Sequence, residues 1–178
     1  MLLIFQDGRE NLVISAERTA TAIRGGLQQV YVEAVRHLLG AMSGAGPPVP
    51  SDDEIEAAAE RWAREYAAAL GREIADSTRD LAGQVDDIDA VFGQKRVEMI
   101  AATEITRAIS AAEAWVLLFW TDAGFEVRER IWHTEQDGLV CPVCRPLNRT
   151  SETVWRATAP AGPPAHPNCR CWLDYQVG

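Results

Sequence analysis

Apolar residues recur every three or four positions over roughly the first two thirds of the chain, a pattern typical of amphipathic helices. The first such stretch predicts a helix from Leu12 to about Gly40. The apolar segments 2–5 and 12–14 flank an Asp-Gly turn, so a short hairpin is an alternative there. Gly25-Gly26 predicts a kink or a close helix contact. The predicted apolar face contains Leu12, Ala16, Ala20, Ile23, Leu27, Val30, Ala34 and Leu38.

A second helical pattern follows a linker at 43–50 that is rich in glycine and proline. Ser51 and Glu54 have the spacing of a capping box, and the acidic residues after Ser51 suit the positive end of a helix dipole. The helix should therefore begin directly after Ser51 and end at Gly83. Its predicted apolar face contains Ile55, Ala59, Trp62, Tyr66, Leu70, Ile74, Ser77 and Leu81.

A third helix is predicted from after Asp87 to about Asp122, with Gly124 as its stop and Gly93 as a point where it can break. Three helices joined by short links favour an antiparallel helical bundle. The predicted apolar face of this third helix contains Val97, Ala101, Ile105, Ala108, Ala112, Val116 and Phe119.

Beyond Gly124 the helical period is lost. Residues 125–133 alternate imperfectly, as in a short strand, with Phe125, Val127, Glu129, Ile131 and His133 expected on one face. A last short strand is expected at Trp172–Val177, after a segment of turns. We therefore predict a helical region at 1–124 and a small C-terminal lobe at 125–178.

Charge and apolar runs restrict the classes of function. The net charge of −9, without a Lys/Arg run, disfavours non-specific binding to nucleic acid. The short apolar N-terminus does not resemble a signal peptide, and no apolar run has the ~20 residues of a membrane span. We therefore expect a soluble protein that is not exported, and in a reducing cytosol paired cysteines favour metal over disulfides.

The cysteines form two tight groups near the C-terminal end. A Cys-x-x-Cys turn can place two thiolates on one tetrahedral ion, and a second group from a distant segment can complete the shell. We predict a structural zinc site that stabilises a lobe with little core of its own. Five residues are candidates for four places, and spacing does not decide between His166 and the late cysteines: Cys141, Cys144, His166, Cys169 and Cys171. Two disulfides, or four unbound thiols, are the alternatives.

Three segments together resemble the Mu F-like phage head morphogenesis family, with a resemblance that covers roughly Val91 to the C-terminus. They are Ile100-Ala-Ala-Thr-Glu104, Trp132-His-Thr-Glu-Gln-Asp137-Gly-Leu-Val-Cys141-Pro-Val-Cys144, and His166-Pro-Asn-Cys169-Arg-Cys171. In this resemblance the helix 91–123 belongs with the C-terminal part. One departure is Ala102, where the family usually has arginine, and Arg107 can substitute as a partner of Glu104.

The resemblance implies a structural minor capsid protein of a tailed phage, found inside the head near the portal and in the host cytoplasm during assembly. The implied role is head assembly and DNA packaging or delivery, without enzyme activity. The implied partners are the portal protein and the major capsid protein, while self-association and contact with packaged DNA stay open. Three alternatives remain: a small zinc hydrolase or nuclease, a nucleic-acid-binding zinc knuckle, and a host protein with a zinc ribbon.

Single residues carry further expectations. Glu104 is expected either to bond the C-terminal lobe or to pair with Arg107 in solvent. Asp137 before Gly138 is interpreted as turn chemistry, and His133 as a surface histidine. We interpret Arg170 as neutralising a cysteine-rich zinc centre, with contact to a partner as the alternative. The tryptophans at 115, 120, 132 and 155 are interpreted as core or interface anchors.

Overall fold

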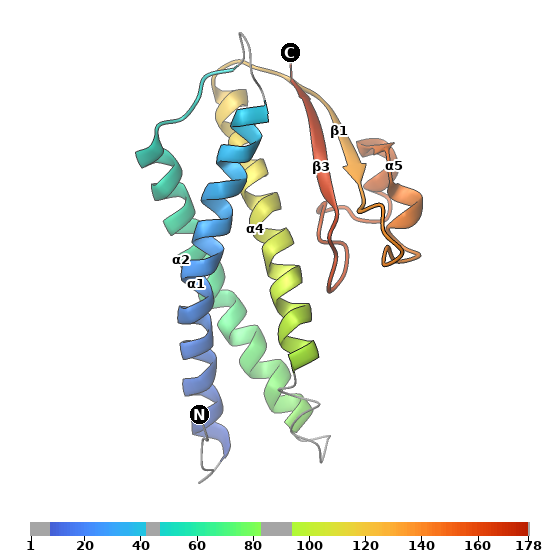
Figure 1. The fold of residues 1–178 in the computed structure, drawn as a ribbon. Helices are drawn as coiled ribbons and strands as arrows, with labels where there is room; N and C mark the ends of the chain where they lie inside the picture. The colour runs from blue at the N-terminus through green and yellow to red at the C-terminus, as the bar shows by residue number, and fades with distance from the viewer. Residues whose placement is uncertain (1–7, 42–46, 83–93, 178) are drawn as a thin grey trace.

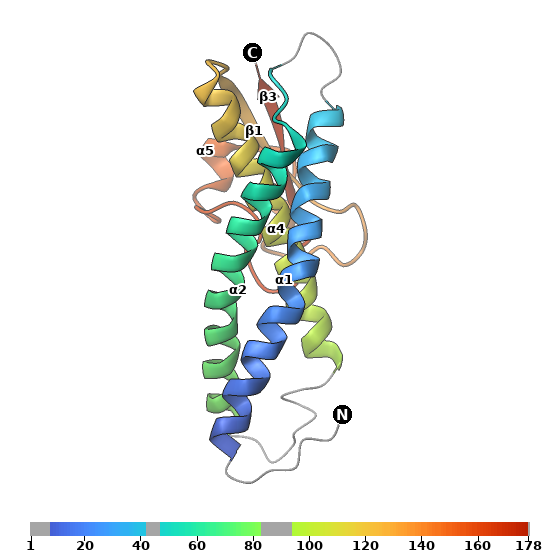
Figure 2. The same ribbon diagram turned by 90° about the vertical axis from the view of Figure 1, so that its left-hand side faces the viewer.

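The computed structural model describes residues 8–41, 47–82 and 94–177. Within these ranges the chain forms three long helices, α1 (Gly8–Ala41), α2 (Asp52–Ala82) and α4 (Gln94–Asp122). The helices lie side by side and alternate in direction, and a small lobe lies beside α4 (Figures 1 and 2). The prediction of a mainly α fold, a bundle of long helices followed by a lobe with short strands, is confirmed. Its division into domains at residue 124 stays a prediction.

Helix α1 is continuous where two features were predicted to break it. Residues 12–14 lie within the helix, so the alternative of an N-terminal hairpin is wrong for them; residues 2–5 lie outside the described ranges. The helix also runs through Gly25 and Gly26, where a Cβ atom would meet nothing within 4 Å, so the predicted close contact there is absent. It ends at Ala41, one residue beyond the predicted stop.

The buried face of α1 is rotated from its predicted position. Tyr31 and Val35 are fully buried, whereas Val30 and Ala34 are only half-buried. The predicted face omits Tyr31, but the Tyr31 ring packs on Trp62 of α2, with ring centroids 5.4 Å apart. A large aromatic ring buries more apolar area than alanine or valine, so the buried face of α1 is centred on Tyr31 and Val35.

Helix α2 begins with the predicted capping box. The Ser51 amide donates to Glu54 Oε2 at 2.8 Å, and the Glu54 amide donates to Ser51 Oγ at 3.3 Å. These reciprocal bonds satisfy amides that a helix start would otherwise leave unpaired. The helix ends at Ala82, and the predicted stop, Gly83, lies outside the described residues, as do the linker residues 43–46.

Helix α4 supplies the centre of the bundle and ends as predicted. Val116 and Trp120 are completely buried against the other two helices, and the Trp120 indole donates to the Pro48 carbonyl at 3.1 Å. At the C-terminus the Gly124 amide donates to Thr121 and the Phe125 amide to Trp120, at 3.0 and 2.9 Å. With φ of 88° at Gly124, this is a Schellman end, which requires the left-handed backbone that glycine adopts freely.

The first part of the predicted α4 face is exposed. Val97, Ala101 and Ile105 lie at the surface, whereas Ala108, Ala112 and Val116 are fully buried. The predicted start of this helix, including Gly93, lies outside the described residues. Among the described residues, no helix combines the length and the apolarity that crossing a bilayer requires.

The lobe is built on a three-stranded antiparallel sheet in the order β2-β1-β3. Strands β1 (Val127–His133) and β3 (Trp172–Val177) were predicted, β1 starting two residues later than expected. The two-residue strand β2 (Thr150–Ser151) and the one-turn helices η1 (Arg145–Leu147) and α5 (Glu152–Trp155) were not. They lie in the segment interpreted from its prolines and glycines as turns.

A bulge in β1 moves Val127 to the opposite face from the one predicted, whereas Glu129, Ile131 and His133 share a face as predicted. The pairing partners of Val127, Arg130 and Trp132 are positions 177, 175 and 173, which are two residues apart and so share one face. The register shift lies between Val127 and Glu129. Simple alternation placed Val127 with Ile131, but the extra residue at 128 puts Val127 on the face of the fully buried Trp132.

Candidate metal centre

The two cysteine groups come from segments that meet at one end of the sheet, where His133 of β1 pairs with Trp172 of β3. Cys141 and Cys144 lie in the turn before η1, and His166, Cys169 and Cys171 lie in the loop before β3. All four cysteines are free thiols, and the sulfur atoms of Cys144 and Cys169 are 3.9 Å apart. A disulfide needs sulfurs about 2.05 Å apart, so the alternative of two disulfides is not what the structure contains.

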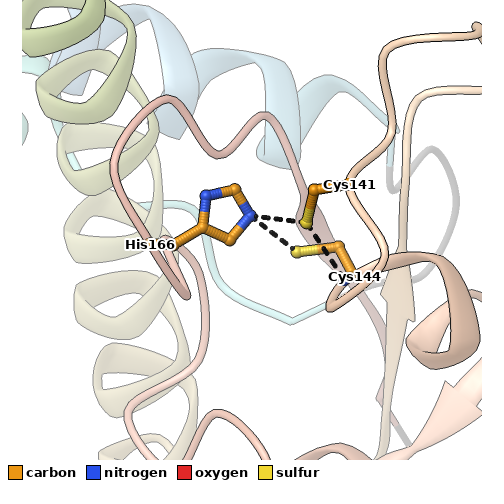
Figure 3. A group of neighbouring side chains, drawn as sticks. All are labelled: Cys141, Cys144 and His166. Atoms are coloured by element: carbon orange, nitrogen blue, oxygen red, sulfur yellow. Dashed lines mark hydrogen bonds between the residues drawn. The ribbon is translucent and has the colours of Figure 1, made fainter.

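His166 closes the first group of donors (Figure 3). Its Nε2 lies 2.9 Å from the Cys141 sulfur and 3.1 Å from the Cys144 sulfur. The Cys144 amide donates to the Cys141 sulfur at 3.2 Å, and the Arg145 amide to the Cys141 carbonyl at 3.0 Å. These amide bonds hold the Cys-x-x-Cys turn so that both sulfurs face the same point.

Cys144 also belongs to a second group, with Cys169 and Cys171. In each group the three ligand atoms lie within 4.8 Å of one another, so all five predicted residues gather around Cys144. Tetrahedral zinc with Zn–S bonds of about 2.3 Å separates its sulfurs by roughly 3.8 Å, which the 3.9 Å between Cys144 and Cys169 matches. The donors line a cavity of about 30 Å³, enough for one small ion. The residues can therefore hold a metal ion.

The imidazole of His166 has its free nitrogen directed at the sulfurs. Its Nδ1 lies 2.7 Å from the Pro167 carbonyl oxygen, which can only accept, so Nδ1 carries the proton. In the neutral ring Nε2 then offers a lone pair to the cluster, and a hydrogen bond to the other nitrogen is the usual support of a metal-binding histidine.

The thiols influence one another strongly. Hydrogen bonding from Cys171 lowers the pKa of Cys169 to about 5, while burial and the charge of Cys169 raise the pKa of Cys144 to about 12. The bond to Cys169, together with burial, also raises the pKa of Cys171. The Cys169 thiolate therefore forms easily, and its charge opposes ionisation of Cys144 and Cys171, which a cation among the sulfurs would favour. Soft, closely packed donors of this kind suit a thiophilic ion such as zinc.

An ion pair outside the cluster joins the two ligand segments. Both Asp137 oxygens contact Arg170, at 2.9 and 3.0 Å, and Oδ1 also accepts from the Leu139 amide at 3.0 Å. The interpretation of Asp137 as turn chemistry is confirmed. The Arg170 guanidinium hydrogen-bonds to Asp137 and lines the same cavity as the cysteines, so its predicted neutralising role at the metal centre stays a prediction.

Two threonines of α4 hold the second ligand loop. Thr103 lies in one of the segments that carry the family resemblance, but sequence reasoning gave neither threonine a role. The Asn168 amide donates to Thr103 Oγ1 at 2.7 Å, and Thr106 Oγ1 donates to the Cys169 carbonyl at 2.6 Å. Both threonines are buried. Their three-residue spacing puts them on one side of the helix, and polar residues there among apolar neighbours were the available signal.

Glu104 was expected either to bond the lobe or to pair with Arg107. Its contacts are with Tyr66 of α2 and Arg107 of α4. It is 6% exposed, accepts a hydrogen bond from the Tyr66 hydroxyl of α2, and lies 3.5 Å from Arg107. Pairing with Arg107 is confirmed, with the Glu104 carboxylate buried and the Arg107 side chain exposed. The Arg107 guanidinium also lies 5.6 Å from the Tyr66 ring centroid, so Tyr66 of α2 contacts both members of the pair.

Farther along α4, a buried carboxyl contacts the sheet. The Tyr175 hydroxyl donates to Glu113 Oε2 at 3.0 Å, and Tyr175 packs against both the helical core and the core of the lobe. Burial raises the pKa of Glu113 to about 8, and the nearby Asp174 carboxylate acts in the same direction. Glu113 therefore joins the bundle and the lobe largely as a neutral acid near pH 7.

The remaining residues singled out from the sequence lie outside the group of candidate ligands. His133 contacts Asp174 at 2.9 Å and stacks on Trp172, on the face of the sheet opposite to Trp132. Trp132 and Trp155 are buried and pack on each other, with ring centroids 5.8 Å apart, as core residues of the lobe. Their interpretation as core is confirmed.

Comparison with known protein families found a match for this chain. Residues 58–174 match the family described as Phage Mu protein F like protein. Comparisons with curated proteins and with solved structures gave no match. The match begins within α2, well before Val91, where the motifs placed the start of the resemblance, and the contact of Tyr66 with Glu104 shows why α2 belongs to the unit. The chain belongs to the Phage Mu protein F like family, which suggests a role in phage head morphogenesis.

Proposed function

We propose that this protein is a structural minor capsid protein of a tailed phage, located inside the head near the portal. The family match over residues 58–174 carries the proposal, because it includes most of α2, α4 and the lobe together. The family implies capsid-related partners. The proposed partners are the portal and major capsid proteins, and the proposed role is head assembly and DNA packaging or delivery.

Helix α4 supplies a surface suited to such partners. Val97, Ile105 and Leu118 are 59%, 44% and 64% exposed, and exposed apolar side chains on a rigid helix are common contact points between proteins. The net charge of −9 makes packaged DNA a less favourable partner than protein.

A fractionation experiment tests the location. The full chain carrying a small tag is expressed during infection, and procapsids and virions are purified from wild-type phage and from a phage without portal protein. We expect the tagged chain in wild-type particles and its loss from particles without portal. A tagged unrelated protein measures non-specific trapping. Absence from wild-type procapsids and virions would exclude the proposal, and incorporation without portal would reassign the chain to the capsid shell.

We further propose that the cysteine cluster holds one structural zinc ion, bound by four of Cys141, Cys144, His166, Cys169 and Cys171. When bound, zinc would join the two ligand segments and neutralise their thiolates. Five protein donors for four places leave no position for a water nucleophile, which supports a structural rather than an enzymatic site. Mass spectrometry of the purified chain should find one zinc per chain. A metal-free, correctly folded chain would remove the zinc site without affecting the location.

A further inference from the structure

The ligand loop between His166 and Cys171 makes its polar contacts with α4 through two hydroxyls. The Thr103 hydroxyl donates to the Met99 carbonyl at 2.7 Å while it accepts from the Asn168 amide, so both of its roles are used. The Thr106 hydroxyl lies 2.6 Å from the Cys169 carbonyl but 3.2 Å from the Ala102 carbonyl, so its one proton favours the loop.

The loop conformation depends on these contacts. Asn168 has φ of 62°, in the left-handed region, and the Cys169 amide donates to the His166 carbonyl at 3.2 Å. Together they form a tight turn that brings His166 and Cys169 to the same cluster. Thr103 fixes the amide of the left-handed residue, and Thr106 fixes the carbonyl of the ligand that follows it.

We propose that Thr103 and Thr106 are positioning residues of the metal centre and couple metal affinity to helix α4; this rests on the proposed zinc site. Neither threonine is a candidate ligand of the ion. Their hydroxyls orient the ligand loop, in the way that groups behind metal ligands commonly control affinity. The family-matched helix and the cysteine cluster are thereby one functional unit rather than two packed neighbours.

The test separates the hydroxyl from the shape of the side chain. Thr103→Val, Thr106→Val and the double variant keep the volume of threonine but lose the hydroxyl. Zinc affinity of the full chain is measured by competition with a chromophoric chelator, and Co²⁺ is added to record the ligand-field spectrum of the site. We expect zinc affinity to fall about 10–100-fold in the double variant, with an altered Co²⁺ spectrum. Thr103→Ser and Thr106→Ser should restore wild-type values.

Thr121→Val is the matched control. Thr121 lies on the same helix and donates to the Leu117 carbonyl at 2.8 Å, in the same way that Thr103 donates to Met99, but α4 carries it beyond the loop. Its zinc affinity should equal that of wild type. If the double valine variant does not fold by far-UV circular dichroism, Thr103→Val alone is used, since it leaves the Cys169 carbonyl paired.

The outcomes distinguish the two levels of the proposal. A wild-type chain that binds neither zinc nor Co²⁺ would remove the metal site and the positioning role with it. A wild-type chain that binds zinc as tightly as its folded valine variants, with identical Co²⁺ spectra, would overturn the positioning role alone. An equal loss of affinity in Thr121→Val would assign the effect to general destabilisation of α4, and would also overturn it.

Discussion

At the scale of single residues, Cys144 differs from the other donors because it belongs to both groups of ligand atoms. His166 completes one group and Cys171 belongs to the other. A tetrahedral ion needs four donors, so one of the five is surplus in any arrangement. Removing Cys144 weakens both groups at once, whereas His166 and Cys171 can replace each other.

Substitution of single ligands should therefore have unequal effects. We expect Cys144→Ser to weaken zinc binding by more than 100-fold, beyond the roughly 10–100-fold typical of losing a residue behind the ligands. Cys171→Ser and His166→Ala should each keep one zinc per chain, and the double variant should lose it. Chelator competition on all four proteins measures this, and a Cys171→Ser variant as weak as Cys144→Ser would show that no donor is surplus.

Glu113 should make stability depend on pH between about 5 and 8. The ordinary pKa of a glutamate side chain, 4.5, rises to about 8 for Glu113 in the folded chain, so the folded state holds the proton more tightly than the unfolded state. The stabilisation is complete below pH 4.5 and is lost as pH rises through about 8. Relative to Glu113→Gln, the wild type should lose about 2–4 kcal/mol of unfolding free energy between pH 5 and 8.

Urea unfolding of both proteins at the two pH values measures this difference. Glu126→Gln, at an exposed position, is the control and should follow wild type. Titration of the cysteines is common to all three proteins and cancels in the comparison. An unchanged difference between wild type and Glu113→Gln at the two pH values would mean that Glu113 ionises as easily in the folded chain as in the unfolded one.

At the scale of elements, two kinds of glycine should respond in opposite directions. Gly25 and Gly26 lie inside α1 with open space around the position of a Cβ atom, so alanine there should stabilise the chain by about 1 kcal/mol each. Gly124 also has open space, but its φ of 88° makes alanine unfavourable by roughly 1 kcal/mol. Thermal unfolding of Gly25→Ala, Gly26→Ala and Gly124→Ala measures the contrast. Destabilisation by either α1 substitution would indicate a contact at that face.

Local signals explain why these elements were predictable from the sequence. The Ser51–Glu54 box, the Gly124 stop and the Trp172–Val177 strand depend on residues a few positions apart, and each lies where it was predicted. The clustering of the five candidate ligands was predictable because cysteine and histidine residues at such spacings have few other uses. Long-range contacts were not predictable in the same way. The threonine contacts join residues 63 and 65 positions apart, and a one-residue bulge moved Val127 to the other face of β1.

At the scale of the whole molecule, the described residues form two cores that share few side chains. The helical core centres on Val35, Ala59 and Trp120, and the lobe core on Trp132, Trp155 and the cysteines. Tyr175 packs against both, and α4 contacts the lobe through Thr103, Thr106 and Glu113. The lobe core includes three of the candidate metal ligands, whereas the helical core includes none.

Metal removal should therefore unfold the lobe and spare the helices. We expect a strong chelator to abolish the near-UV circular dichroism of the Trp132–Trp155 pair, while most of the far-UV helical signal remains. Zinc added in excess should restore the near-UV signal. Cys144→Ser provides the comparison, since it should resemble the chelated wild type without any chelator. Loss of the helical signal in parallel with the near-UV signal would mean that the bundle cannot fold without the lobe.

The antiparallel pairing of β1 with β3 determines how the lobe responds to mechanical force. Val127 pairs with Val177, so the chain enters and leaves the sheet at the same end, and tension between these ends separates one residue pair at a time. Such unzipping proceeds at low force until it passes the last pair, His133 and Trp172. An ion shared by Cys144 and Cys169 would then bear the load, and the segment between them would stay shielded from extension until a metal–sulfur bond broke.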